Sequence, residues 1–157
     1  MGTRPTQHPA RNQDQGRSNL GPYGDFCIQL DDSVGRILDT LDRKGFAENT
    51  LVVFTADNGC APYIGIEELN EQGHYPSYIY RGYKADIWEG GHRVPFLARW
   101  PSKIEAGTHS GETICLTDLL STCASIVGAE LPDTAGEDSY DILPALLGNS
   151  TSEPIRE

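Results

Sequence analysis

An acid and an amide stand side by side just after a short apolar run. Residues 51–54 are Leu-Val-Val-Phe, a pattern typical of a buried strand, and Asp57, Asn58 and Gly59 follow it closely. A carboxylate oxygen and an amide carbonyl oxygen are hard donors, which suit Ca²⁺ or Mg²⁺ better than zinc. Because ligands gather beyond the carboxyl ends of strands in open α/β sheets, the pair predicts a divalent-cation site, with Gly59 permitting the turn.

The same residues also fit a hairpin, since Asn-Gly after an apolar run is a strong signal for a type I′ turn. A tight hairpin needs a second strand immediately afterwards, and residues 60–73, CAPYIGIEELNEQG, do not supply one. On local pattern alone, both interpretations stay open.

A second group of chemically useful residues lies in the segment RGYKADIWEGGHRVPFLARWP, residues 81–101. The Lys84 ammonium is suited to holding a tetrahedral oxyanion as a point charge. The glycine pair at 90–91 lets backbone approach a ligand closely. The alternative for Lys84 is an ordinary solvated surface charge. The other charges fit ion pairs that hold the loop, with Arg81 and Arg93 opposite Asp86 or Glu89.

A helix and a strand would position the acid–amide pair. From Tyr23 onward, apolar residues recur every three or four positions, which predicts an amphipathic helix that ends at Lys44 and Gly45. Residues 49–56, NTLVVFTA, predict a strand. A helix, a short turn and a continuous apolar strand indicate one unit of an α/β sheet.

The rest of the chain predicts a long loop, a second strand and two further helices. Residues 57–83 have no clear period and predict the loop, and a loop of that length is usually functional or disordered. Residues 93–100 predict a strand in which Pro95 favours an edge or a strand start. Residues 114–127 predict a helix ended by Gly128, and residues 142–149 a short final one.

Composition narrows the class of partner. The chain has 157 residues and a formal net charge of −11, so no basic patch can release counterions from nucleic acid or an anionic membrane. No run approaches the length of about 18 apolar residues that a membrane span needs. The four scattered cysteines predict buried thiols. Residues 1–19 are polar and aperiodic, which predicts a disordered or non-native lead-in before a single domain at 20–157.

Several segments in order resemble the sulfatase family. They are residues 21–59 (GPYGDF through TADNG), 73–101 (GHYPSYIYRGYKADIWEGGHRVPFLARWP), 116–132 (LTDLLSTCASIVGAELP) and 141–148 (DILPALLG). The resemblance implies an alkaline-phosphatase-like α/β sandwich, with a central, mostly parallel sheet flanked by helices. It also implies hydrolysis of sulfate esters of small molecules or carbohydrates.

The resemblance assigns roles to particular residues. Asp57 and Asn58 match the second acid–amide pair that holds the family's divalent cation, usually Ca²⁺, with Mg²⁺ as the alternative. Lys84 matches the catalytic lysine that contacts the sulfate and the nucleophile. His74 lies in the variable loop, where either a substrate-binding role or an ordinary loop position fits. His92 is expected to be structural.

The nucleophile motif of the sulfatase family does not occur before the acid–amide pair in this sequence. That nucleophile is a Cys or Ser in C/S-x-P-x-R, oxidised to formylglycine, and Cys60 with Pro62 has Ile64 where the arginine belongs. Cys60 also follows the acid–amide pair, whereas the family's nucleophile precedes it, so Cys60 is rejected. The paired upstream aspartates are missing as well, and His8 is the one candidate for a further family histidine.

The chain is therefore expected to be the C-terminal part of a sulfatase catalytic domain whose N-terminal half is missing. Alone, it would be inactive and would leave open sheet edges. Two alternatives remain: a phosphate or phosphonate ester hydrolase of the same superfamily, against which Asn58 argues, and a non-catalytic module that keeps a degenerate half-site. Family resemblance suggests a periplasmic or secreted location.

Overall fold

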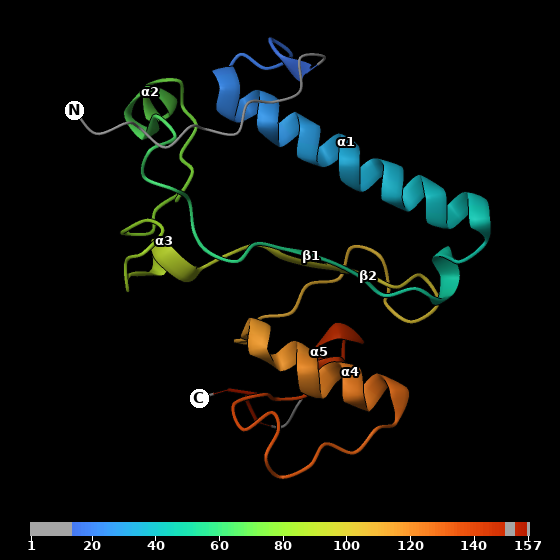
Figure 1. Ribbon diagram of the computed structural model, residues 1–157. Helices are drawn as coiled ribbons and strands as arrows, with labels where there is room; N and C mark the ends of the chain where they lie inside the picture. Colours follow the sequence, from blue (N-terminus) through green and yellow to red (C-terminus); the bar gives the residue numbers. More distant parts are fainter. Residues whose placement is uncertain (1–13, 150–152, 157) are drawn as a thin grey trace. The chain divides into compact units, whose positions relative to one another are not determined.

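The computed structural model describes residues 14–149 and 153–156 (Figure 1). The chain divides into two compact units. The first contains the described residues up to Ala47 together with Val53–Leu97. The second contains Glu48–Val52 and the described residues from Ala98 onward. His8, one of the residues singled out from the sequence, lies outside the described ranges.

Helix α1, Gly21–Lys44, is the longest element and confirms the helix expected from the apolar period. A proline occupies its first turn, where the missing N–H costs nothing because that group has no partner inside a helix. Gly45 ends it in the left-handed conformation with φ of 72°, after two basic residues in the last turn. Neither α1 nor any other helix in the described ranges is long and apolar enough to cross a lipid bilayer.

Residues 14–19, which composition assigned to a disordered lead-in, fold back onto the start of α1. The buried Asp25 carboxylate accepts hydrogen bonds from the backbone N–H groups of Gly16 at 2.7 Å and Ser18 at 2.8 Å. These two bonds lower the pKa of Asp25. A Cβ on Gly24 would lie 2.7 Å from Ser18 Cβ and 2.8 Å from Leu20 Cβ, so a glycine is needed for this close approach. The remainder of the expected lead-in lies among the residues that are not described.

The apolar stripe of α1 is only partly covered. Phe26 and Leu30 are each 45% exposed and Ile37 is 56% exposed. Over the described residues as a whole, the apolar side chains that are fully buried are Ala47, Leu69 and Ile142. The chain therefore leaves uncovered an unusual share of the apolar surface that normally stabilises a fold.

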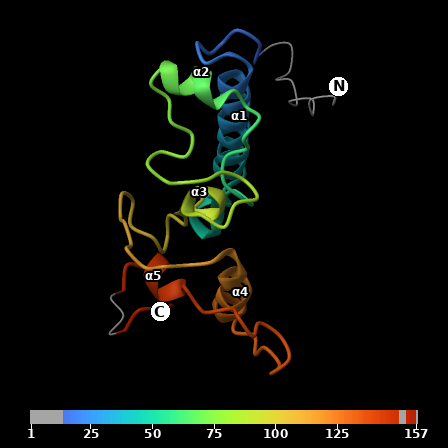
Figure 2. The ribbon, with the colours of Figure 1, turned by 90° about the vertical axis from the view of Figure 1, so that its left-hand side faces the viewer.

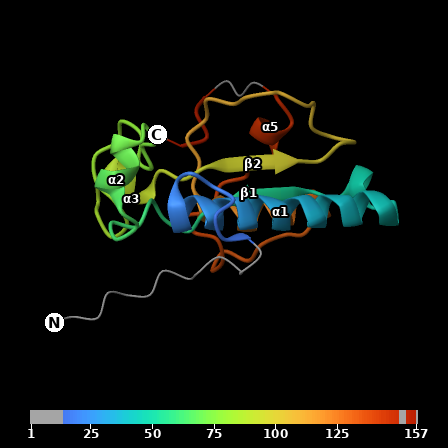
Figure 3. The ribbon, with the colours of Figure 1, turned by 90° about the horizontal axis from the view of Figure 1, so that it is seen from above.

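Strands β1, Val52–Thr55, and β2, Phe96–Arg99, confirm the two strands expected from sequence and pair in one sheet (Figure 3). They run antiparallel, because β1 leads toward α2 and α3 while β2 returns from them (Figure 1). The mostly parallel sheet expected from the family resemblance is thus not formed by these two strands. All four residues of β1 are half-buried rather than buried, since within the described chain the strand has only one neighbour.

The connection between the strands carries two short helices that the sequence period did not reveal. Helix α2, Ile66–Glu71, begins after Gly65 and buries Leu69. Helix α3, Glu89–His92, is a single turn whose two glycines are buried. Segments of four and six residues are too short to establish a 3.6-residue period. In two views α2 lies near the beginning of α1 (Figures 1 and 2).

The second unit is built around a buried ion pair. Its helical elements are η3, Leu116–Asp118, α4, Leu119–Val127, and α5, Leu143–Leu146, while the 3₁₀ turn η2, Ala47–Asn49, precedes β1. The Asp118 side chain is fully buried, and Arg156 Nε donates to its Oδ2 at 3.0 Å. Thr122, also fully buried, accepts from the Ile142 N–H at 3.0 Å and so ties α4 to the start of α5.

Candidate active site

The turn after β1 is fixed by a close contact with α3. The backbone N–H of Gly59 donates to the carbonyl oxygen of Gly91 at 2.8 Å. A Cβ on Gly59 would lie 1.8 Å from the carbonyl oxygen of Gly90, a distance that no side chain can adopt. Asp57 and Asn58 thus sit on a rigid turn between β1 and α3, not on the hairpin that Asn-Gly also suggested.

The segment that carries Lys84 is bonded to this same turn. The backbone N–H of Lys84 donates to the carbonyl oxygen of Cys60 at 2.8 Å, and the N–H of Gly90 donates to the carbonyl oxygen of Arg81 at 2.8 Å. Lys84 therefore lies on a strap whose two sides are held by the post-β1 turn and by α3. The two groups of residues singled out from the sequence are adjacent through their backbones, although 26 residues separate Asn58 from Lys84.

The glycine pair in α3 has a different role from the one expected. A Cβ on Gly90 would lie 2.1 Å from the carbonyl oxygen of Gly82, and a Cβ on Gly91 would lie 2.2 Å from that of Asp86. The space next to these glycines is filled by the chain's own backbone. The expectation that this pair lets backbone approach a ligand is therefore corrected: it lets two loops approach each other.

The side chains of Asp57 and Lys84 are both exposed, and within the described ranges neither forms an ion pair. Asn58 is half-buried, and its Nδ2 donates to the carbonyl oxygen of Gly59 at 3.1 Å. This bond uses an N–H group of the amide and not its oxygen. The turn thus carries a carboxylate and an amide as candidate oxygen ligands, and the neighbouring strap carries one ammonium.

This donor set suits a hard cation but is incomplete. A carboxylate and an amide oxygen are ordinary Ca²⁺ ligands, and that ion takes about six to eight oxygens. Among the described residues, no group of three or more His, Cys, Asp or Glu side chains is arranged to hold a metal ion. Asp57 and Asn58 by themselves therefore do not make up a complete Ca²⁺ site.

The family model described as "Sulfatase" matches residues 2–129, which is most of the chain. This chain belongs to the sulfatase family. Rat steryl-sulfatase is 43% identical over 147 residues, covering 92% of this chain and 25% of the relative. The N-acetylgalactosamine-6-O-sulfatase of Bacteroides thetaiotaomicron is 39% identical over 140 residues, covering 85% of this chain and 26% of the relative.

The fold is also that of solved sulfatase-family structures. A structure reported under glycosaminoglycan metabolism by Bacteroides thetaiotaomicron superposes with a TM-score of 0.82 and is 35% identical, covering 96% of this chain and 33% of that one. The chain therefore spans about a quarter to a third of the length of the sulfatases that it matches.

His74 is held against α1. With Lys84, it is one of the two residues that the sequence suggests for substrate binding. Its Nε2 lies 3.3 Å from the hydroxyl of Tyr23, and the two rings are 5.3 Å apart. Burial, together with the nearby thiol of Cys27, raises the pKa of Tyr23 to about 12. The contact favours the ordinary loop position for His74. The sequence does not predict this contact, because Tyr23 and His74 are 51 positions apart.

Cys60 has the properties of a structural thiol. It is half-buried, and burial followed by the charge of Cys27 raises its pKa. A thiol that holds its proton is a poor nucleophile, which agrees with its rejection on sequence grounds. The prediction of buried thiols is wrong for the other cysteines, since Cys27, Cys115 and Cys123 are exposed.

Of the two arginines expected to pair with an acid near α3, Arg93 does so, whereas Arg81 stacks on an aromatic ring. Arg93 pairs with Glu89 at 2.8 Å, and Arg81 stacks on the Trp88 ring with its guanidinium carbon 3.8 Å from the ring centroid. The His92 side chain is 60% exposed and lies 3.9 Å from Glu89. His92 was expected to be structural, but an exposed contact of this length contributes little to the stability of the fold.

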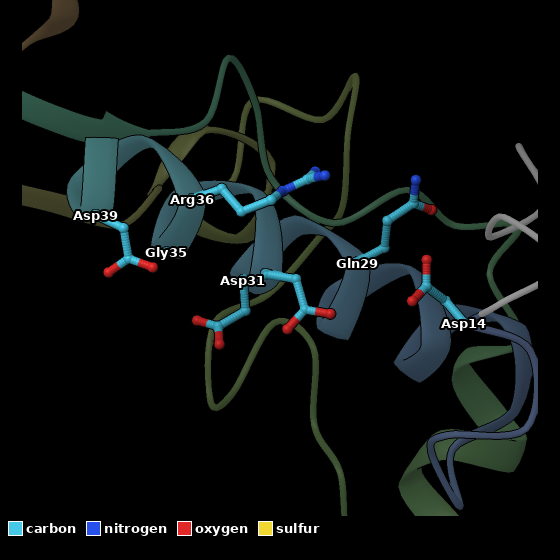
Figure 4. Close-up of a pocket in the computed structure, with 7 residues that line it drawn as sticks. Asp14, Gln29, Asp31, Gly35, Arg36 and Asp39 are labelled. Atoms are coloured by element: carbon cyan, nitrogen blue, oxygen red, sulfur yellow. The ribbon is translucent and has the colours of Figure 1, made fainter. Parts of the chain in front are cut away.

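A hollow of about 410 Å³ lies away from this turn, on α1 (Figure 4). Arg17 bridges two of its carboxylates, those of Asp14 and Asp32. None of the side chains singled out from the sequence lines it. Acidic residues dominate its wall, which includes Asp14, Asp31, Asp32 and Asp39 together with Gln29 and Arg36.

Substituting Gly59 by alanine is expected to misplace the acid–amide pair. The new methyl group cannot avoid the Gly90 carbonyl, so either the turn or α3 must move. A displacement of about 1 Å costs roughly 100-fold in turnover. Gly35→Ala in α1 is the control, because nothing lies within 4 Å of its added Cβ and alanine favours helix. Similar kcat/KM values for both variants, measured in the full-length protein that contains this chain, would contradict the role given to Gly59.

Proposed function

We propose that this chain is the C-terminal part of the catalytic domain of a sulfatase that hydrolyses sulfate esters, and we call the longer protein the parent sulfatase. The observation that carries the proposal is the backbone bond between Lys84 and the Asp57–Asn58 turn, within a chain of the sulfatase family. The uncovered apolar stripe of α1 also supports it, because residues outside this chain would cover that stripe.

In the parent sulfatase, Asp57 and Asn58 would supply two oxygen ligands to Ca²⁺. When bound, such a cation would neutralise negative charge on the sulfuryl oxygens. Lys84 would donate hydrogen bonds to the same sulfuryl group from the adjacent strap and orient it for attack. Gly59 would keep these donors in register, since its N–H and its lack of a side chain fix the turn to α3.

The nucleophile would come from residues outside this chain. In the sulfatase family that group is a formylglycine, and we propose the same for the parent. Asp57, Asn58 and Lys84 would serve charge stabilisation and orientation, and none of them would form a bond to sulfur. The chain alone is accordingly expected to be inactive.

The test compares two esters of one fluorescent phenol, 4-methylumbelliferyl sulfate and 4-methylumbelliferyl phosphate, with purified parent protein. Cleavage of the sulfate, loss of activity with EDTA and recovery with Ca²⁺ are expected. Preferential cleavage of the phosphate would identify a phosphate ester hydrolase instead. If neither ester is cleaved, saccharide and steroid sulfates are tested next, and failure on all of them by protein shown to carry formylglycine by mass spectrometry would favour a non-catalytic module.

A further inference from the structure

Tyr78 combines a disfavoured backbone with a ring that the described chain leaves uncovered. Its φ is 50°, in the left-handed region, where glycine or asparagine is normally found. Its side chain is nevertheless 72% exposed. Packing against the described residues therefore does not explain why a bulky aromatic residue occupies this position, and backbone strain of this kind is often found where a protein binds ligands.

The ring of Tyr78 is also supported from behind. It meets the ring of Tyr80 edge-on, with centroids 6.2 Å apart and planes at 68°. Tyr80 in turn lies beneath the guanidinium of Arg93 at 4.7 Å, and Arg93 is paired with Glu89 of α3. The turn itself is closed by the Tyr78 N–H, which donates to the carbonyl oxygen of Tyr75 at 2.8 Å. These contacts hold the ring in one orientation.

This supported ring belongs to the segment that carries Lys84. From Tyr78 the chain runs through Arg81, whose carbonyl oxygen accepts from Gly90, to Lys84, whose N–H bonds to the turn of Asp57 and Asn58. The same helix, α3, thus anchors both the aromatic support and the strap. Tyr78 thus lies six positions before Lys84 on a segment that is bonded to the turn after β1 and to α3.

We propose that Tyr78 determines substrate specificity in the parent sulfatase by stacking against a sugar ring of a sulfated carbohydrate. This inference rests on the proposed sulfatase function. An aromatic ring can stack on the apolar C–H face of a sugar. The tyrosine hydroxyl and the charged side chains nearby can form hydrogen bonds with the sugar's hydroxyl groups. A steroid sulfate, whose apolar ring system offers few groups to a tyrosine hydroxyl, serves as the contrasting substrate.

The experiment uses Tyr78→Gly and Tyr78→Phe in the parent sulfatase. Glycine removes the ring but relaxes the left-handed backbone, so the variant is expected to fold with an unchanged or higher Tm. Phenylalanine keeps the ring and serves as the matched control. The substrates are N-acetylgalactosamine 6-sulfate, glucosamine 2-N,6-O-disulfate, a sulfated carrageenan oligosaccharide and a steroid sulfate.

For Tyr78→Gly, we expect KM for the saccharide that the wild type cleaves best to rise about 10-fold. Tyr78→Phe should stay close to wild type, and inhibition by inorganic sulfate should be equal in all three proteins, because the sulfate-binding groups are untouched. This separation of saccharide KM from sulfate inhibition is the result that supports the proposal.

Four outcomes would overturn it: unchanged saccharide kinetics in Tyr78→Gly, a loss confined to the steroid sulfate, hydrolysis of the steroid sulfate alone by the wild type, or a lower Tm with equal losses on all substrates. The last would show that the ring packs against another part of the parent. If the wild type cleaves no sulfate ester at all, the proposed function itself fails and this inference falls with it. Unchanged kinetics in an active enzyme removes only the role of Tyr78.

Discussion

Replacement of Asp57 by alanine is expected to lower kcat/KM of the parent sulfatase for sulfate esters by roughly 10³-fold or more. The side chain is exposed at the end of a fixed turn, so its removal leaves the backbone bond between Gly59 and Gly91 in place. The loss would therefore report on the carboxylate and not on the fold. If Asp57 were an ordinary surface aspartate without a ligand, its replacement would leave kcat/KM almost unchanged.

A second measurement makes this prediction independent of turnover. Ca²⁺ that binds the folded protein raises its Tm, and that rise should be lost or much reduced in Asp57→Ala. Asp31→Ala is the matched control, since Asp31 is likewise an exposed aspartate but lies on α1. We expect Asp31→Ala to match the wild type in both assays. Equal turnover and an equal Ca²⁺-dependent rise in Tm for Asp57→Ala would remove Asp57 from the metal site.

The second large effect is expected from Asp118→Ala, in the unit that carries no proposed catalytic group. Asp118 is fully buried and accepts from the N–H groups of Cys115 at 2.7 Å and Tyr140 at 3.0 Å, as well as from Arg156. Alanine leaves two backbone donors and one guanidinium without their acceptor. Because the Arg156 side chain is 21% exposed and can be partly solvated, we expect a cost of about 3 kcal/mol in the free energy of unfolding, the lower end of the range for breaking a buried ion pair.

Asp138→Ala is the control for this unit. Arg156 also bonds Asp138, but through the backbone carbonyl oxygen at 2.6 Å, which alanine retains. The control should therefore change the free energy of unfolding by less than about 0.5 kcal/mol. Both variants are to be compared in the parent by urea unfolding. A cost for Asp118→Ala as small as that of the control would mean that the buried pair contributes no net stability.

The Asp118 network also sets a direction for pH dependence. Burial alone would raise the pKa of Asp118, but the hydrogen bonds from Arg156, Tyr140 and Cys115 outweigh it, so the pKa lies below its usual value. The unfolded chain therefore binds the proton more readily. The contribution of this carboxylate to stability is complete above about pH 4 and declines as the pH falls through the lowered pKa. Asp118→Ala should show a flatter decline in acid than the wild type.

The elements near the candidate site were predictable wherever they were long or continuous. The stripe that begins at Tyr23 gave α1 and its end at Gly45, and the apolar runs gave β1 and β2, because these patterns are local. The short helices α2 and α3 were missed because neither is long enough to repeat a period. The mostly parallel sheet implied by the family resemblance is not formed by β1 and β2, which pair antiparallel, and the direction of a strand relative to its neighbours depends on contacts between distant segments.

Sequence alone determined the chemical character of this protein: an acid–amide pair after a strand, a lysine on the next segment, and an order of segments that places the chain in the sulfatase family. These are properties of residue type and spacing along the chain. Only the tertiary structure decided that the Lys84 strap bonds to the turn after β1, and that Gly59, Gly90 and Gly91 are there for contact between loops. Such contacts depend on how distant segments fit together in space. At each of them a glycine, which has no side chain, allows two backbones to come close. The local sequence around a glycine does not show which distant segment it will contact.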